Sequence, residues 1–140
     1  MLVAMYETFE HTADVGLRVV APDLDTLFAE AGEALFALIV EDLAAVEPRE
    51  AVALHIDGDD LPFLLFDWLN ELLYRFDGEH RLLTRFRVRV GPTGLDGEAW
   101  GEAWDAGRHA LDHEVKAITY HGLRVAPTPD GWLAEVIVDI

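Results

Sequence analysis

The sequence contains no cysteine and only one lysine, Lys116, among its 140 residues. The absence of cysteine excludes disulfide bonds, thiolate nucleophiles and zinc sites built on thiolates. The N-terminus has no basic leader, and no apolar run approaches the roughly 20 residues that a bilayer-spanning helix needs. We therefore expect a cytoplasmic protein that makes no contact with membranes.

Basic residues are scarce as a class, with 10 Lys and Arg against 27 Asp and Glu, for a formal net charge of −17. High-affinity binding of nucleic acid depends on basic side chains that neutralise phosphates, so direct binding of this kind is not expected. An acidic surface suits metal ions and basic protein partners. The same imbalance could also serve solubility alone, and the composition does not separate these two explanations.

The length and composition predict one folded domain that spans residues 1–140. Apolar residues make up 51% of the chain, which is enough for a substantial core at this size. Two segments, 24–39 and 61–76, carry apolar residues at helical spacing. Asp23 precedes the first as a predicted N-cap, and Asp59 and Asp60 precede the second.

Strand-like patterns fill most of the remaining chain. We expect strands over residues 5–9, 15–21, 51–57, 83–90, 98–104, 114–126 and 132–140. The predicted order is therefore β-β-α-β-α-β-β-β-β. Two amphipathic helices, each with one apolar stripe, would cover one face of a mixed, mostly antiparallel sheet, which is a two-layer α+β domain.

A polar stretch between two apolar strands, YETFEHTADVG at 6–16, is the first candidate for function, because binding residues are often found on such loops. The other end of the chain supplies Asp139 and the carboxylate of Ile140. If the last strand lies beside the first ones, these groups and Asp14 bring three carboxylates together, which suits a hard cation. The alternative is that Asp14 caps a turn and Asp139 ends a strand.

Three further residues are weaker candidates. Asp42 could join the carboxylates as an additional ligand or contact a partner. His11 could be a ligand or a proton carrier, although such a histidine more often ties down a loop. Lys116 could pair with the carboxylates or reach a phosphate, and the alternative is a solvated strand lysine. We find no Ser-His-Asp arrangement and no glycine-rich phosphate loop, so the residues favour a regulator or binding partner over an enzyme.

Four segments together are similar to one known family. The segments are YETFEHTADVG at 6–16, LLFDWLNELLYRFD at 64–77, VKAITYHGL at 115–123 and VDI at 138–140, and they resemble the archeases from end to end. The resemblance implies a small α+β protein that assists the GTP-dependent RNA ligase of tRNA splicing. That ligase uses a guanylylated histidine and divalent metal to join a 2′,3′-cyclic phosphate or 3′-phosphate end to a 5′-hydroxyl end.

The resemblance also implies roles for individual residues. By position, the metal ligands of the family fall on Asp14, Asp139 and Ile140, and its functional lysine falls on Lys116. Asp42 aligns only loosely. The implied metal is Ca²⁺, with Mg²⁺ or Mn²⁺ as alternatives, and the implied activity is to promote guanylylation and multiple turnover of the ligase. The rival interpretations are a chaperone-like binding protein and a metal-dependent hydrolase.

Overall fold

The computed structural model describes residues 2–11 and 14–140, with side chains described for 2–9 and from 14 onward. Within these residues the elements follow one another in this order: β1 (Met5–His11), β2 (Asp14–Ala21), α1 (Leu24–Ile39), a 3₁₀ turn η1 (Leu43–Ala45), β3 (Glu50–Asp57), α2 (Leu61–Asp77), β4 (Arg81–Gly91), β5 (Gly94–Ala103), β6 (Ala117–Ile118), β7 (Arg124–Thr128) and β8 (Gly131–Asp139).

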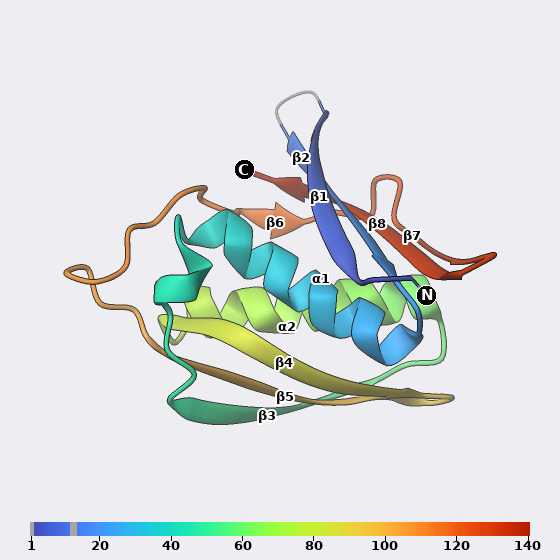
Figure 1. Cartoon of the computed structure of the whole chain (residues 1–140), viewed down its shortest axis with the longest axis horizontal. Coiled ribbons are helices and arrows are strands. Elements are labelled where there is room, and N and C mark those ends of the chain that lie inside the picture. Colours follow the sequence, from blue (N-terminus) through green and yellow to red (C-terminus); the bar gives the residue numbers. More distant parts are fainter. Residues whose placement is uncertain (1, 12–13) are drawn as a thin grey trace.

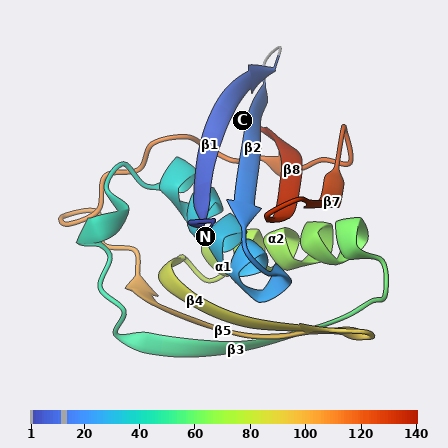
Figure 2. The same cartoon turned by 45° about the vertical axis from the view of Figure 1, so that its right-hand side comes forward.

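The strands form two antiparallel sheets. The first has the order β1-β2-β8-β6, with β7 also paired to β8, and the second has the order β3-β5-β4. Both helices lie between the two sheets and contact strands of each (Figures 1 and 2). The α+β class is therefore confirmed, but the expected two layers with a single sheet are wrong, because the helices form a middle layer.

The buried surface of α1 explains this third layer. Its buried residues are not confined to one stripe but extend around much of the helix, as the following set shows: Leu27, Phe28, Ala31, Gly32, Ala34, Leu35, Phe36, Leu38 and Ile39. Phe36 faces the second sheet, where its ring lies 6.1 Å from the ring of Phe86 on β4. A helix that is apolar on two sides needs cover on both, and one sheet supplies only one side.

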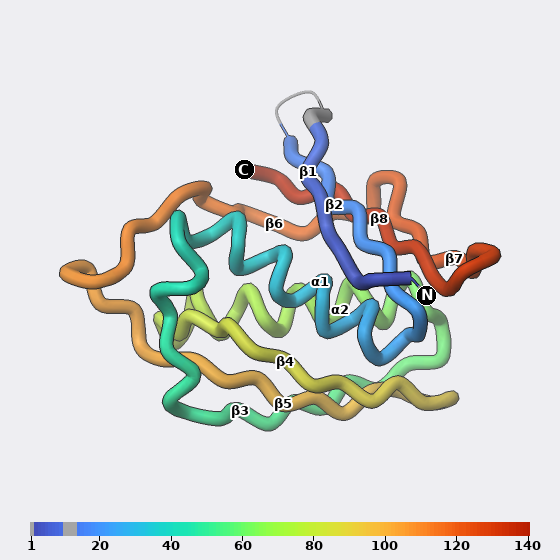
Figure 3. Tube along the Cα trace, in the orientation of Figure 1, coloured from blue at the N-terminus to red at the C-terminus, as the bar shows by residue number. Residues whose placement is uncertain are grey.

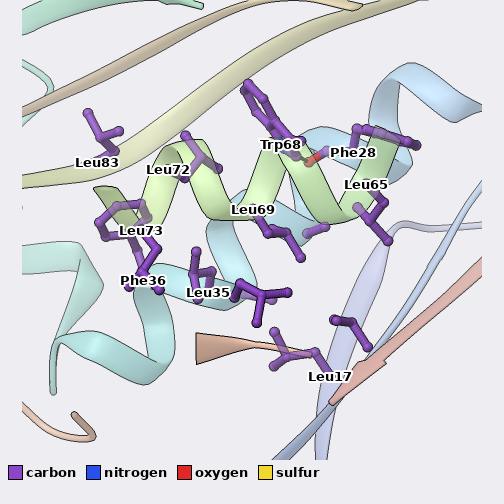
Figure 4. Close-up of a cluster of buried hydrophobic side chains, with 14 of the residues drawn as sticks. Leu17, Phe28, Leu35, Phe36, Leu65, Trp68, Leu69, Leu72, Leu73 and Leu83 are labelled. Atoms are coloured by element: carbon purple, nitrogen blue, oxygen red, sulfur yellow. Dashed lines mark hydrogen bonds between the residues drawn. The ribbon is translucent and has the colours of Figure 1, made fainter. Parts of the chain in front are cut away.

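The helices begin where the sequence predicts. The carboxylate of Asp23 accepts from the N–H of Thr26 at 2.8 Å, and that of Asp60 accepts from the N–H of Phe63 at 3.1 Å. The two helices also share a buried contact, since the indole N–H of Trp68 donates to the carbonyl of Phe28 at 2.9 Å (Figure 4). Within residues 2–11 and 14–140, no helix is long and apolar enough to cross a bilayer.

The single strand expected over 114–126 is wrong. The chain forms the short β6, leaves the sheet, and returns as β7 (Figure 3). The N–H and the hydroxyl of Thr119 both donate to the carbonyl of Ile137, at 3.0 and 2.9 Å. After this point the ring of Tyr120 stacks on Phe66 of α2, and Gly122 turns the chain with a φ of 63°. Among the described residues the order therefore has eight strands and two α-helices, with eight strands in place of the expected seven.

Candidate functional site

The predicted meeting of the N-terminal strands with the end of the chain is present at the edge where β2 begins and β8 ends. In the antiparallel register of these two strands, Asp14 lies directly opposite Asp139. Leu17 and Val19 of β2 are buried toward the helices. Side chains alternate along a strand, so the residues between them, and Asp14 in the same series, face outward. Ile140 follows Asp139 along the chain. We call the Asp14 and Asp139 pair the acidic rung.

The acidic rung differs from the other charged positions of the two sheets. Like charges directly opposite each other destabilise an antiparallel pair, whereas opposite charges stabilise it. Among the described residues with a side chain, the acidic rung is the one cross-strand pair of like charge. The other charged pairs join a base to an acid: Glu7 with Arg18, Arg18 with Glu135, His55 with Asp96, Arg87 with Glu98, Arg89 with Asp96, and Arg124 with Glu135.

Lys116 lies beside the acidic rung. Its main-chain N–H donates to the carbonyl of Asp139 at 2.8 Å, and the next residue, Ala117, pairs with Asp139 in the register of β6 and β8. The side chain of Lys116 is exposed, and no described acidic side chain is within ion-pair distance of its ammonium group. The structure thus brings Asp14, Asp139 and the only lysine of the chain to one end of the first sheet.

A glycine and an aromatic ring shape the surface next to the acidic rung. Gly16 lies between Asp14 and Arg18 on the outer face of β2, and a Cβ at this position would lie 2.1 Å from the ring of Phe9. The ring therefore covers Gly16, and any larger residue would displace it. The guanidinium carbon of Arg18 lies 4.6 Å from the centre of the same ring and also pairs with Glu7 and Glu135, at 2.7 and 3.1 Å.

The remaining predicted residues have different positions. The carboxylate of Asp42 caps η1, where it accepts from the N–H of Ala44 at 3.1 Å. The main chain of His11 pairs with Asp14, but its side chain lies outside the described residues, so its role stays a prediction. In the described part of the chain, no group of three or more His, Cys, Asp or Glu side chains is placed to hold a metal ion. A cation at the acidic rung would thus rely on two side chains and on main-chain oxygens.

A second carboxylate centre, Glu102, was not predicted from the sequence. Glu102 and His109 are buried, with 5% and 3% of their surface exposed. The N–H of Glu47 and the Nε2–H of His109 donate to one carboxylate oxygen, at 2.8 and 2.9 Å, and Arg108 donates to the other. The Nδ1 atom of His109 accepts from the N–H of Asp105 at 3.0 Å, so the proton of the imidazole is on Nε2.

This centre holds the loop between β5 and β6 against the body of the protein. Burial by itself raises the pKa of the Glu102 carboxyl, but the hydrogen bonds from Glu47, Arg108 and His109 outweigh burial and lower the pKa from 4.5 to about 2. Every oxygen of the carboxylate thus has an internal donor, which indicates a structural role. The sequence offered little signal, because Glu102 is a polar residue of a predicted strand and His109 lies in a polar segment typical of a solvated loop.

The comparisons with known proteins agree on one family. The model of the Archease protein family matches residues 6–140. The chain is 42% identical to the protein archease of Methanopyrus kandleri, with 96% of this chain and 99% of that protein covered. It is 38% identical to the protein archease of Pyrococcus furiosus, with 96% and 98% covered.

Two solved structures share the fold. The solution structure of Methanobacterium thermoautotrophicum protein 1598 superposes with a TM-score of 0.86 and 34% identity, covering 96% of this chain and 98% of that one. A crystal structure from Thermotoga maritima, described as an archease and possible chaperone, gives a TM-score of 0.65 over 97% and 98% of the two chains. Its identity is 20%, so this second likeness concerns the fold alone.

Proposed function

Since this chain belongs to the archease family, we propose that it is an accessory protein that activates the GTP-dependent RNA ligase of tRNA splicing. In this proposal the chain is an activator and not an enzyme. It promotes guanylylation of the ligase and so permits multiple turnover. The partner comes from the family resemblance, and the residues that would act on it come from the site described above.

The observation that carries the proposal is the acidic rung. Two carboxylates that lie opposite each other in register repel, and a cation bound between them would turn this repulsion into attraction. Carboxylate and main-chain oxygens are the donors that hard divalent cations prefer. Asp14 and Asp139 would therefore hold Ca²⁺, or Mg²⁺ or Mn²⁺, with the carboxylate of Ile140 as the third predicted ligand.

Lys116 adds a second positive charge next to this rung. An ammonium group is a compact point charge on a flexible stem, and it binds phosphate well. The side chain is exposed, while its main chain is fixed by the hydrogen bond to Asp139, so the ammonium can reach outward from a defined position. A bound cation would supply positive charge for the phosphates of a nucleotide, and Lys116 would help to orient them in the active site of the ligase.

The charge of the whole chain fits a protein partner that itself binds RNA. With a net charge of −17, this protein does not compete with the ligase for RNA. Electrostatic attraction would instead favour docking on the basic surface that an RNA ligase needs for its substrate. The acidic surface would thus guide the acidic rung and Lys116 to the mouth of the ligase active site.

A reconstituted joining assay tests the proposal. The assay measures joining of RNA with a 3′-phosphate end by the matching ligase in the presence of GTP, with this protein at substoichiometric and stoichiometric amounts. We expect stimulation by the unmodified protein and by an Asp130→Ala control in the exposed turn before β8. Asp14→Ala and Lys116→Ala should each abolish it while circular dichroism shows a retained fold. Full stimulation by both variants would end the proposal.

A chaperone-like activity is the second candidate, because the Thermotoga maritima protein of the same fold is described as a possible chaperone. This candidate predicts that the chain protects unrelated proteins from aggregation and that Asp14 is not needed. The two functions separate in one comparison of Asp14→Ala with the unmodified protein in a light-scattering assay and in the joining assay. Loss of joining with unchanged light scattering favours the activator.

A further inference from the structure

Three aromatic side chains form a cluster on the surface of α2. The ring of Tyr120 stacks on Phe66, with centres 4.1 Å apart and planes inclined by 16°, and it meets the edge of Phe63 at 5.5 Å and 68°. Phe63 and Tyr120 are nevertheless 51% and 60% exposed. We call Phe63, Phe66 and Tyr120 the aromatic cluster. Exposed aromatic side chains that are gathered in this way are typical of interaction sites.

The core of the protein accounts for only part of the aromatic cluster, because Phe66 is half-buried against the core while Phe63 and Tyr120 are exposed. The side of α2 that packs into the core carries Leu64, Leu65, Trp68, Leu69, Leu72 and Leu73. Phe63 and Phe66 are on the outer side, where the next residue, Asp67, is exposed. Asp59 and Asp60 are also exposed, at the N-terminal end of the same helix. The aromatic cluster therefore has an acidic rim that consists of Asp59, Asp60 and Asp67.

One segment joins the aromatic cluster to the acidic rung. Residues 116–120 run along β8, held by the hydrogen bonds from Lys116 to Asp139 and from Thr119 to Ile137. Tyr120 follows Lys116 by four residues, which in an extended chain is a span of about 13 Å. A macromolecule that covers Lys116 and the acidic rung would therefore also reach Tyr120, whereas a small ligand would not.

We propose that the aromatic cluster and its acidic rim form the surface on which the protein partner of the acidic rung docks. This inference rests on the proposed function and assigns a second contact to the same partner. The partner would present apolar side chains for the rings and surround them with Arg or Lys opposite Asp59, Asp60 and Asp67. Apolar anchors at the centre and charges at the rim are the common arrangement of a specific interface.

The charges around the aromatic cluster favour a different protein as its partner over single-stranded RNA and over a second copy of this chain. Aromatic rings also stack on the bases of single-stranded RNA, but such sites combine the rings with basic groups that hold the phosphates. Here the neighbouring charges on α2 are carboxylates, and Lys116 is the only lysine of a chain of net charge −17. A second copy of this chain would bring two acidic rims together, and like charges oppose such contact.

Calorimetric titration of the matching ligase with variants of this protein tests the docking surface. The double variant Phe63→Ser with Tyr120→Ser removes the exposed rings, and Asp67→Lys reverses one charge of the rim without touching a ring. Tyr74→Ser is the matched control, because Tyr74 is 56% exposed on the same helix, about 16 Å along the axis from Phe63. We expect binding to weaken by about tenfold or more for the double variant and by about fivefold for Asp67→Lys, and to stay within about twofold for Tyr74→Ser.

The outcomes distinguish this inference from the proposed function. If the unmodified protein binds and stimulates the ligase but the double variant and Asp67→Lys bind equally well, the docking surface is wrong and the activator function stands. If the unmodified protein neither binds nor stimulates the ligase, both the docking surface and the activator function are wrong. Binding of single-stranded RNA that is lost in the double variant would reassign the surface to nucleic acid. A dimer in sedimentation that the double variant dissociates would reassign it to self-association.

Discussion

Two residues of opposite charge on the outer face of β2 each lie opposite a carboxylate of β8. Arg18 lies between Glu7 of β1 and Glu135 of β8 and pairs with both, and the ring of Phe9 lies against its guanidinium group. Four residues earlier, Asp14 faces Asp139 of the same strand β8. We call the first set the Arg18 rung. Its charges are of opposite sign, whereas the acidic rung places two carboxylates opposite each other, where we propose that a cation binds.

This difference separates a position whose charges pair within the sheet from the position that we propose for cation binding. Both rungs lie on the outer face of β2 and include a residue of β8, so neither the face nor this neighbouring strand separates them. What separates them is the sign of the charges that the register brings together. The following predictions exchange or remove these charges, and they are ordered from the largest expected effect to the smallest.

The largest effect is expected when the acidic rung is made to resemble the Arg18 rung. Asp139→Lys places an ammonium group opposite Asp14, so the repulsion becomes an attraction and one carboxylate ligand is lost. We expect the affinity for Ca²⁺ in calorimetric titration to fall by about 100-fold or more, and ligase stimulation to disappear. The control Asp130→Lys makes the same charge change in an exposed turn and should bind Ca²⁺ normally. Normal Ca²⁺ binding by Asp139→Lys would show that the acidic rung does not hold the cation.

A buried carboxylate with internal partners should behave as a purely structural group. Glu102→Gln removes the charge that Arg108, His109 and the N–H of Glu47 share, and we expect a loss of about 2 kcal/mol in the free energy of unfolding at pH 7. Cation binding at the acidic rung should not change. Urea unfolding measures the first and calorimetry the second.

The same variant has a signature in acid. The pKa of Glu102 is about 2 in the folded protein and close to its ordinary value of 4.5 in the unfolded chain, so the unfolded chain binds the proton first as the pH falls. The stabilisation by the ionised carboxylate is complete above pH 4.5 and is lost between pH 4.5 and 2. The difference in stability between the unmodified protein and Glu102→Gln should shrink over this interval. A constant difference would contradict the assigned hydrogen bonds.

Removal of the central charge of the Arg18 rung should cost less. Arg18→Gln leaves Glu7 and Glu135 without their shared base and removes the contact with Phe9. We expect the free energy of unfolding to fall by less than in Glu102→Gln, because exposed ion pairs and exposed cation–π contacts contribute little. Calcium titration should be unaffected. An equal loss of Ca²⁺ affinity in this variant would show that the two rungs are not independent.

The smallest expected change in the free energy of unfolding distinguishes the two rungs most clearly. Neutralising one carboxylate should stabilise the protein at the acidic rung and destabilise it at the Arg18 rung. In cation-free protein at low salt, Asp139→Asn relieves a repulsion and should raise the free energy of unfolding by about 0.5 kcal/mol. Glu135→Gln on the same face of β8 removes an attraction and should lower it by about the same amount. Denaturant melts of the two variants at several salt concentrations measure both, and added salt should reduce both differences.

The features that could be predicted from the sequence are those that neighbouring residues decide. Asp23 and Asp60 cap helices because their side chains reach main-chain groups three residues away. The arginines of β4 alternate with apolar residues, and the strand has the predicted faces. The acidic rung was expected from the chain ends, and it required only that β8 lie beside β2, which the structure confirms.

The features that could not be predicted depend on contacts between distant segments. The expected strand over 114–126 is interrupted because Tyr120 finds its partner on α2, about 50 residues away in sequence, and local alternation does not reveal this. The second sheet exists because β3 pairs with β5 across α2 and β4. Glu102 lies in a predicted strand and His109 in a polar segment typical of a loop, and only the folded chain shows that the two meet and are buried.

The most direct test of the central claim is the melting temperature of cation-free protein on addition of Ca²⁺. If the acidic rung holds a cation in the folded state, the melting temperature of the unmodified protein rises with the Ca²⁺ concentration. Asp139→Asn should lose most of this rise, and Glu135→Gln should keep it. The same rise in all three proteins, or no rise in the unmodified protein with Ca²⁺, Mg²⁺ or Mn²⁺, would contradict the account.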